Sequence, residues 1–169
     1  MKKIFVNQIL YIRLLSFFPA LLLLGIIFGF SAQTGEDSGS LSFQISLFLV
    51  QLFSPFLPAA DTHEILWQRA ETIHLFVRKA AHMTEYFLLT LSLHLPMLTC
   101  FKERFSSKSR LWIVFLLTLF FAATDEFHQS FVAGRSGNVI DVCIDSVGIL
   151  SATLLIYVIS LKKRKRVKQ

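Results

Sequence analysis

The segment "VIDVCIDSVGILSATLLIYVISL", residues 139–161, is long and apolar enough to cross a lipid bilayer as one helix. Two acidic residues, Asp141 and Asp145, interrupt it, and both lie near its start. A charged side chain deep in a bilayer costs roughly 2.5–3.5 kcal/mol on insertion scales, so such residues usually face protein or water. The segment therefore predicts a membrane span whose first turns bring polar groups to a defined place.

Three more apolar segments precede it, at residues 14–30, 80–100 and 111–123. The third reaches spanning length only if its helix continues into the "TDEFHQSF" that follows. With 54% hydrophobic residues and 18 Phe in 169 residues, the composition is that of a membrane protein. We predict an all-α, polytopic membrane helical bundle with four transmembrane helices. It forms a single domain over residues 1–169, with a core at about 14–161.

Residues 41–58, "LSFQISLFLVQLFSPFLP", form a fifth apolar stretch that contains two glutamines and ends in two prolines. The pattern favours an interfacial or re-entrant helix in the first outer loop. A fifth span is the alternative, but it would break the charge pattern of the loops.

The basic residues indicate the orientation of the chain, because Lys and Arg accumulate in cytoplasmic loops. The N-terminal segment, the loop before residue 111 and the basic tail at residues 162–169 carry thirteen of the seventeen Lys and Arg. Four spans with both termini in the cytoplasm place all thirteen inside. Ten of the eleven acidic residues then lie outside or in the outer half of the membrane, and Glu103 is the exception.

Two alternatives concern the ends of the chain. The basic tail could resemble a nucleic-acid patch, but beside a membrane span it is better explained by topology and contact with anionic lipid. We therefore expect the bilayer as a partner and no nucleic acid. The start, "MKK" followed by an apolar run and "FSAQ", could be a cleaved signal peptide, although Phe30 fits a cleavage site poorly.

Polar residues gather at the predicted outer ends of all four spans. In the second span they form a stripe on one helical face, and in the third and fourth they recur at spacings of three and four residues. We predict that they line one ligand-binding pocket open to the outside. Its residues are Ser31, Gln33, Lys79, His82, Glu85, Tyr86, Asp125, Glu126, Gln129, Arg135, Asp141 and Asp145.

Several kinds of chemistry fit this set. The candidates for general acid–base catalysis are His82, Glu85, Asp125 and Glu126. Arg135 and Lys79 could hold a phosphate. No metal site is predicted, and Asp125, Glu126, Asp141 and Asp145 are only weak candidates for Mg²⁺. The sequence leaves open whether the protein uses a cofactor. Because it has no known catalytic motif, it also leaves open whether the protein is an enzyme.

Three further residues have predicted local roles. Arg135 lies in the glycine-rich loop "VAGRSGN", where it could contact a ligand or pair with Asp141 or Asp145. His94, deep in the second span, is expected to bond a neighbouring helix. Gly148 is expected to allow close helix packing.

The motifs "FSAQTG", "RKAAHMTEY" and "TDEFHQSFVAGRSGNVIDVCIDSVG" occur in this order on four hydrophobic segments. In this respect the chain resembles the VanZ-like family of small bacterial membrane proteins over residues 28–154. The combination of DE-x-HQ, GR-x-G and D-x-x-x-D-x-x-G carries the resemblance. The last motif often has Asn where this chain has Asp145.

The resemblance implies a multi-pass protein of the bacterial cell membrane, linked to resistance against the glycopeptide teicoplanin. Teicoplanin carries an acyl chain and acts at the outer membrane face. We therefore expect a polar site that binds an amphiphilic or lipid-linked molecule of the cell envelope. One alternative is a membrane-embedded hydrolase or transferase, with or without a need for Mg²⁺, that acts on an outer-leaflet phospholipid or lipid-linked wall intermediate. Another is a small transporter or flippase, which would act as a homodimer.

Overall fold

The computed structural model describes residues 10–56 and 62–167, with side chains described up to residue 163. Within these ranges the chain is all helical, which confirms the predicted fold class. The elements are α2 (Phe18–Ser31), α3 (Gly35–Phe53), the short 3₁₀ helix η1 (Ser54–Phe56), α4 (His63–Thr99), α5 (Ser107–Gln129) and α6 (Val139–Val167). Residues 10–15 are also helical and lead into α2 through a turn.

Three of the helices begin at a hydroxyl residue that caps the first turn. The side chains of Thr34, Thr62 and Ser106 accept hydrogen bonds from backbone N–H groups three residues further on, at the starts of α3, α4 and α5. Such caps satisfy donors that a helix leaves free at its N-terminus. The third predicted span does continue to Gln129, so α5 is long enough to cross a bilayer.

The apolar core shows which helices form the bundle. It consists of buried side chains from α2, α4, α5 and α6: Ala20, Ile27, Tyr86, Leu89, Leu93, Val114, Ala122 and Ile149. The helix α3 contributes none of them. Outside the core, the same four helices expose many large apolar side chains, as helices that face lipid do.

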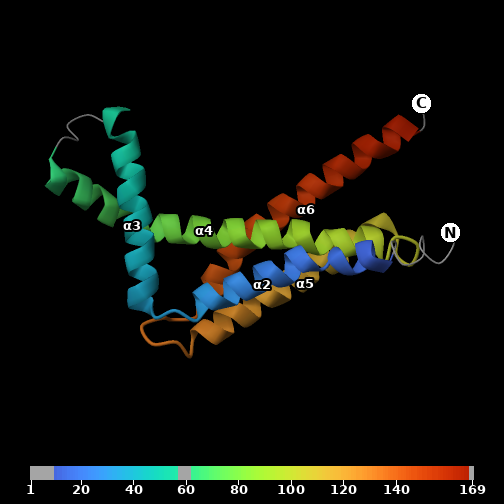
Figure 1. Ribbon diagram of the computed structural model, residues 1–169, viewed down its shortest axis with the longest axis horizontal. Helices are drawn as coiled ribbons and strands as arrows, with labels where there is room; N and C mark the ends of the chain where they lie inside the picture. Colours follow the sequence, from blue (N-terminus) through green and yellow to red (C-terminus); the bar gives the residue numbers. More distant parts are fainter. Residues whose placement is uncertain (1–9, 57–61, 168–169) are drawn as a thin grey trace.

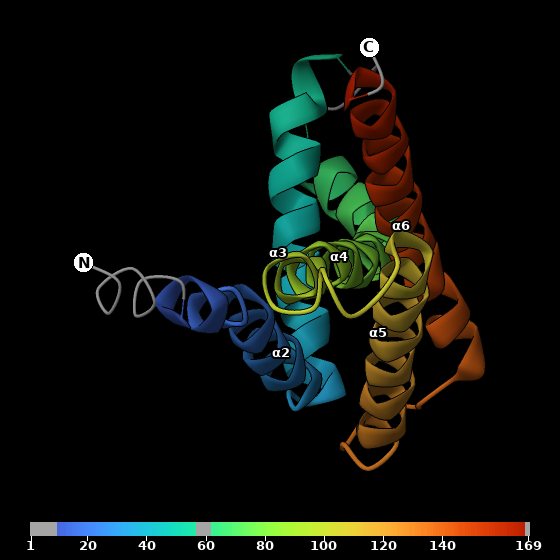
Figure 2. The same cartoon turned by 90° about the vertical axis from the view of Figure 1, so that its right-hand side faces the viewer.

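Composition alone selects a slightly different set of spans. The stretches long and apolar enough to cross a membrane are Leu10–Ser31, Gly35–Phe56, Ser107–Gln129 and Val139–Lys163. This set contains α3 but not α4, because the polar stripe that starts at Arg78 lowers the mean hydropathy of the apolar half of α4. The geometry separates the two helices, because α4 runs beside α2 and α5 while α3 crosses α4 (Figure 1). Seen along α4, α3 lies side-on (Figure 2).

The helix α4 is also longer than a bilayer requires. Its 37 residues give a length of about 55 Å, against roughly 30 Å for the hydrocarbon core of a membrane. Its first turns therefore extend beyond the bundle, and α3 packs on them with the ring of Phe43 4.6 Å from that of Trp67. The expected span at residues 80–100 is thus the second half of a helix that begins at His63.

Gly148 on α6 lies against the backbone of α4, as expected for a packing glycine. A Cβ atom at this position would stand 2.1 Å from the carbonyl oxygen of Met83. One turn further on, Ala152 is fully buried. The close approach of α4 and α6 therefore depends on the missing side chain at residue 148.

We predict that Gly148→Ala destabilises the folded protein by about 1–3 kcal/mol, because backbone atoms must move to admit the methyl group. Thermal unfolding in detergent measures the change. Gly29→Ala in α2 is the matched control, since a Cβ there meets nothing within 4 Å. The control should keep or raise stability, because Ala favours a helix by about 0.5–1 kcal/mol over Gly. Equal melting temperatures for the two variants would contradict this account of the α4–α6 contact.

Candidate functional site

A polar cavity of about 180 Å³ opens at the end of the bundle where α5 ends and α6 begins. The side chains that line it come from α4, from the end of α5, from the 130–138 loop and from the start of α6. Its charged and titratable residues are Arg78, Lys79, His82, Glu126, Arg135, Asp141 and Asp145. Cations and carboxylates thus face the same small space.

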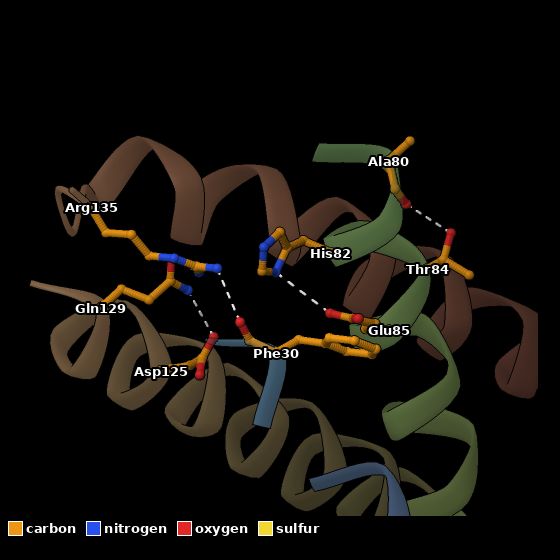
Figure 3. Close-up of polar contacts among 8 residues, drawn as sticks. All are labelled: Phe30, Ala80, His82, Thr84, Glu85, Asp125, Gln129 and Arg135. Carbon is orange, nitrogen blue, oxygen red and sulfur yellow. Dashed lines mark hydrogen bonds and ion pairs between the residues drawn. The ribbon is translucent and has the colours of Figure 1, made fainter. Parts of the chain in front are cut away.

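A chain of hydrogen bonds joins three segments on one side of this cavity (Figure 3). Gln129 donates from Nε2 to the buried Asp125 carboxylate at 3.0 Å, one helical turn earlier on α5. The Arg135 guanidinium donates to Gln129 Oε1 at 2.9 Å and to the carbonyl oxygen of Phe30 at 3.0 Å. That carbonyl is in the last turn of α2 and also accepts a hydrogen bond of 3.2 Å from the Gln33 N–H. Arg135 therefore ties the end of α2 to the end of α5.

The loop that carries Arg135 is fixed by close backbone contacts. Gly134 has a φ of +72°, a conformation that favours glycine. Its carbonyl oxygen would lie 1.9 Å from a Cβ atom at Gly35, the first residue of α3. The N–H of Gly35 also donates to the carbonyl of Ala133 at 3.0 Å. The start of α3 thus holds the loop in place.

Glu126 closes the other end of this loop. Its Oε2 atom accepts a hydrogen bond of 2.9 Å from the N–H of Asn138, and the Asn138 side chain accepts one from Ile140. Both bonds satisfy donors at the N-terminus of α6, where a negative charge is also favoured by the helix dipole. Glu126 is only 7% exposed. One carboxylate oxygen of Glu126 therefore stabilises the start of α6.

Two polar pairs come from α4. Lys79 forms an ion pair with Asp141 on α6, and both side chains are partly exposed. His82 Nδ1 lies 3.5 Å from Glu85 Oε2, which is longer than an ordinary hydrogen bond. The pairing of Asp141 with Lys79, together with the bonds from Arg135 to Gln129 and Phe30, means that Arg135 is not the partner of Asp141 or Asp145.

Two buried polar atoms lie deeper, where α4 meets α5. The Tyr86 hydroxyl and Asp125 Oδ1 are both buried without a hydrogen-bond partner. The Asp125 carboxyl interacts with the Tyr86 hydroxyl, but their contact falls outside hydrogen-bond geometry. Asp125 and Tyr86 thus bring two polar groups together in the apolar interior, where an unsatisfied polar group costs about 1–3 kcal/mol.

Burial and the nearby Arg78 lower the pKa of Arg135, while the acidic side chains around it act in the opposite direction. An arginine pKa starts so high that the guanidinium keeps its charge in this environment. Its Nε atom is buried and has no hydrogen-bond partner. Arg135 therefore places a permanent positive charge at the cavity, and its Nε–H group can still donate a hydrogen bond.

Comparison with known proteins agrees with the helices and motifs. A model of the VanZ/LLP1 family matches residues 16–160. The chain belongs to the VanZ/LLP1 family. No curated protein and no solved structure matches it.

Seven of the twelve residues predicted to bind a ligand line the cavity of this VanZ/LLP1 protein. They are Lys79, His82, Glu126, Gln129, Arg135, Asp141 and Asp145. Glu85 and Asp125 are joined to them through His82 and Gln129, and Tyr86 lies against Asp125. Ser31 is buried with a free hydroxyl, and Gln33 is half-buried; neither lines the cavity.

The sequence prediction missed five lining residues, one of which, Gly134, is a loop glycine without a side chain. Arg78 lies on the predicted stripe of α4, and Leu75 precedes it by three positions on the same face. Ile144 lies three residues after Asp141 on α6. Helical spacing could have found all three. Ser136 belongs to the loop, where no periodicity indicates which side chains turn inward.

The acids do not gather as a metal site. Among the residues that the structure describes, no three His, Cys, Asp or Glu side chains are placed to share an ion. Asp125 is instead bonded to Gln129, Glu126 to Asn138 and Asp141 to Lys79. On the far side of the bundle, His94 Nδ1 is buried without a partner, so the expected bond to a neighbouring helix is absent.

We predict that Glu126→Ala destabilises the protein by about 0.5–1.5 kcal/mol, because it removes the acceptor of the part-buried hydrogen bond from the Asn138 N–H. Glu126→Gln keeps an acceptor oxygen and should recover most of that loss. Thermal unfolding in detergent measures both. Glu103→Ala, an exposed acid at the opposite end, should change stability by less than about 0.5 kcal/mol. If the Ala and Gln variants at position 126 melt alike, the carboxylate does not serve as this cap.

Proposed function

We propose that this VanZ/LLP1 protein binds the polar head of an amphiphilic or lipid-linked envelope molecule at the outer face of the membrane. The observation that carries the proposal is the cavity of about 180 Å³ in which Arg78, Lys79 and Arg135 face Glu126, Asp141 and Asp145. Charges of both signs are costly at the end of an apolar bundle, which favours a role in binding over a role in packing.

The size of the cavity supports a head group as the ligand. Sites that enclose a whole small molecule measure roughly 300–1000 Å³, well above the volume found here. A phosphate or amino group fits, while the rest of the molecule has to lie outside. Leu75 lines the cavity and is 59% exposed, and beside it Phe76 is 75% exposed. An acyl chain of the ligand could pack against these two side chains within the bilayer.

The chemistry of the lining also suits such a head. The guanidinium of Arg135 and the ammonium of Lys79 can bind a phosphate or carboxylate, and Asp145 can accept from a hydroxyl or amine. Asp145 is 3% exposed, and within the described residues it has no hydrogen-bond or ion-pair partner. It is therefore free to serve a ligand. Teicoplanin, to which the family resemblance is linked, is an amphiphile with polar groups and an acyl chain.

The proposal places the cavity outside and both termini in the cytoplasm, in line with the distribution of basic residues. The test uses Ser136→Cys in the cavity loop and Glu103→Cys in the opposite loop, each in a chain whose two native cysteines are replaced by Ala. On intact cells, a membrane-impermeant maleimide should label only the cysteine at position 136, and lysis should expose the other. Labelling of position 103 alone on intact cells would reverse the orientation.

We predict that Arg135→Ala abolishes resistance when the protein is expressed in a teicoplanin-sensitive bacterium, and that Arg135→Lys restores little of it. A lysine brings a point charge but not the fork that reaches two acceptors. Binding of teicoplanin to purified protein in nanodiscs should weaken by about tenfold or more. Arg104→Ala, which removes an exposed cation from the opposite end, is the matched control.

Because Arg135 also bonds Gln129 and Phe30, its loss could impair folding, so a second variant is needed. Lys79→Gln removes a cavity charge whose side chain is 46% exposed, and should leave the melting temperature nearly unchanged. Stable variants that keep both resistance and binding would refute the proposal. Turnover of phospholipid vesicles by the purified protein would instead favour the hydrolase or transferase. Movement of labelled lipid across proteoliposomes would favour the flippase.

A further inference from the structure

A second and larger groove lies at the opposite end of the bundle. It measures about 1020 Å³ and is lined by α4, the 100–106 loop, the start of α5 and the end of α6. Its polar rim includes four cations, Lys102, Arg110, Lys162 and Lys163, and a single acid, Glu103. We propose that this groove binds an anionic phospholipid of the adjacent leaflet, independently of the polar cavity at the other end.

Arg110 provides the strongest observation. It is only 9% exposed, and its NH1 atom donates to the carbonyl oxygens of Lys102 at 2.8 Å and Phe105 at 2.5 Å. Its Nε atom is buried without a partner. The ion pairs among the described residues do not include Arg110, and Glu103 on the same rim does not reach it. A buried guanidinium held by neutral carbonyls has an uncompensated charge, which an anion would neutralise.

Two other features of the groove favour an anion. The exposed ammonium groups of Lys162 and Lys163 end α6 on the same rim. The first turn of α5, capped by Ser106, also faces the groove, and the dipole of a helix attracts negative charge to its N-terminus.

The floor of the groove distinguishes a lipid from a free anion. Leu98, Leu111 and Ile156 line it beside the cations, and its volume is far larger than one phosphate needs. Apolar walls under a basic rim fit a phosphodiester head whose acyl chains continue along the bundle. Basic pockets between membrane helices on the cytoplasmic side hold such lipids by the same combination.

The test measures lipid binding to the purified full-length protein in detergent by native mass spectrometry. Dioleoyl phosphatidylglycerol should bind in clear preference to dioleoyl phosphatidylcholine. Arg110→Gln should weaken phosphatidylglycerol binding by roughly ten- to hundredfold, because it removes a charged hydrogen-bonding partner. The matched control is Arg104→Gln, which removes one cation from the adjacent 100–106 loop but does not line the groove. It should change binding by less than about twofold.

If Arg110→Gln does not fold, the double variant Lys162→Gln/Lys163→Gln replaces it, since both side chains are exposed. Its control is Arg104→Gln/Lys108→Gln, which removes the same charge outside the groove. Equal weakening by variant and control would show diffuse attraction to the basic surface and overturn the proposal. Displacement of the lipid by inorganic phosphate at equal concentration would also overturn it, because the site would then take a free anion.

Discussion

The hydrogen bonds from Arg135 hold together the end of the bundle where α5 ends and α6 begins. A single guanidinium reaches the last turn of α2 through the Phe30 carbonyl and the last turn of α5 through Gln129, which in turn holds Asp125. Helix ends near lipid must find partners for their free backbone groups, because water is scarce there. Arg135 adds a charged donor to the Phe30 carbonyl, which also accepts from the Gln33 N–H, and the same side chain fixes the polar wall of the cavity.

The helix α3, which crosses α4, helps to keep Arg135 in this position. The 130–138 loop can bring Arg135 inward only if its backbone is held, and the start of α3 holds it through Gly35. The helix α3 itself buries the small side chains of Ser42 and Ser46 and the larger Val50 against the extension of α4. It belongs to the scaffold of the cavity without entering the core of the bundle. The segment between α2 and α4 therefore supports the loop that lines the cavity.

Much of this could be predicted from the sequence, and the failures have physical causes. Long apolar runs determine spanning helices, and helical spacing places Lys79, His82, Asp141 and Asp145 on facing surfaces. Hydropathy alone selects α3 and not α4 as a span, and the sequence prediction could place a span at residues 80–100 only by also using the distribution of charged residues in the loops. The hydrogen-bond partners of Arg135 could not be predicted from the sequence either. They depend on the path of a loop set by Gly134 and Gly35, and pairing rules for charges favour carboxylates over the amide and carbonyl that it contacts.

The apolar core between the polar cavity and the basic groove argues against a transport path through one chain. A head group that crossed the interior of one chain would have to pass Leu89, Leu93, Val114 and Ile149, none of which is more than 9% exposed. A close-packed apolar layer of this kind offers no polar path, and the energy needed to desolvate a charged head there is large. Movement along the outside of the bundle or between two copies would be required instead. The closed core thus favours two separate binding sites, one at each end, over a continuous route through the described chain.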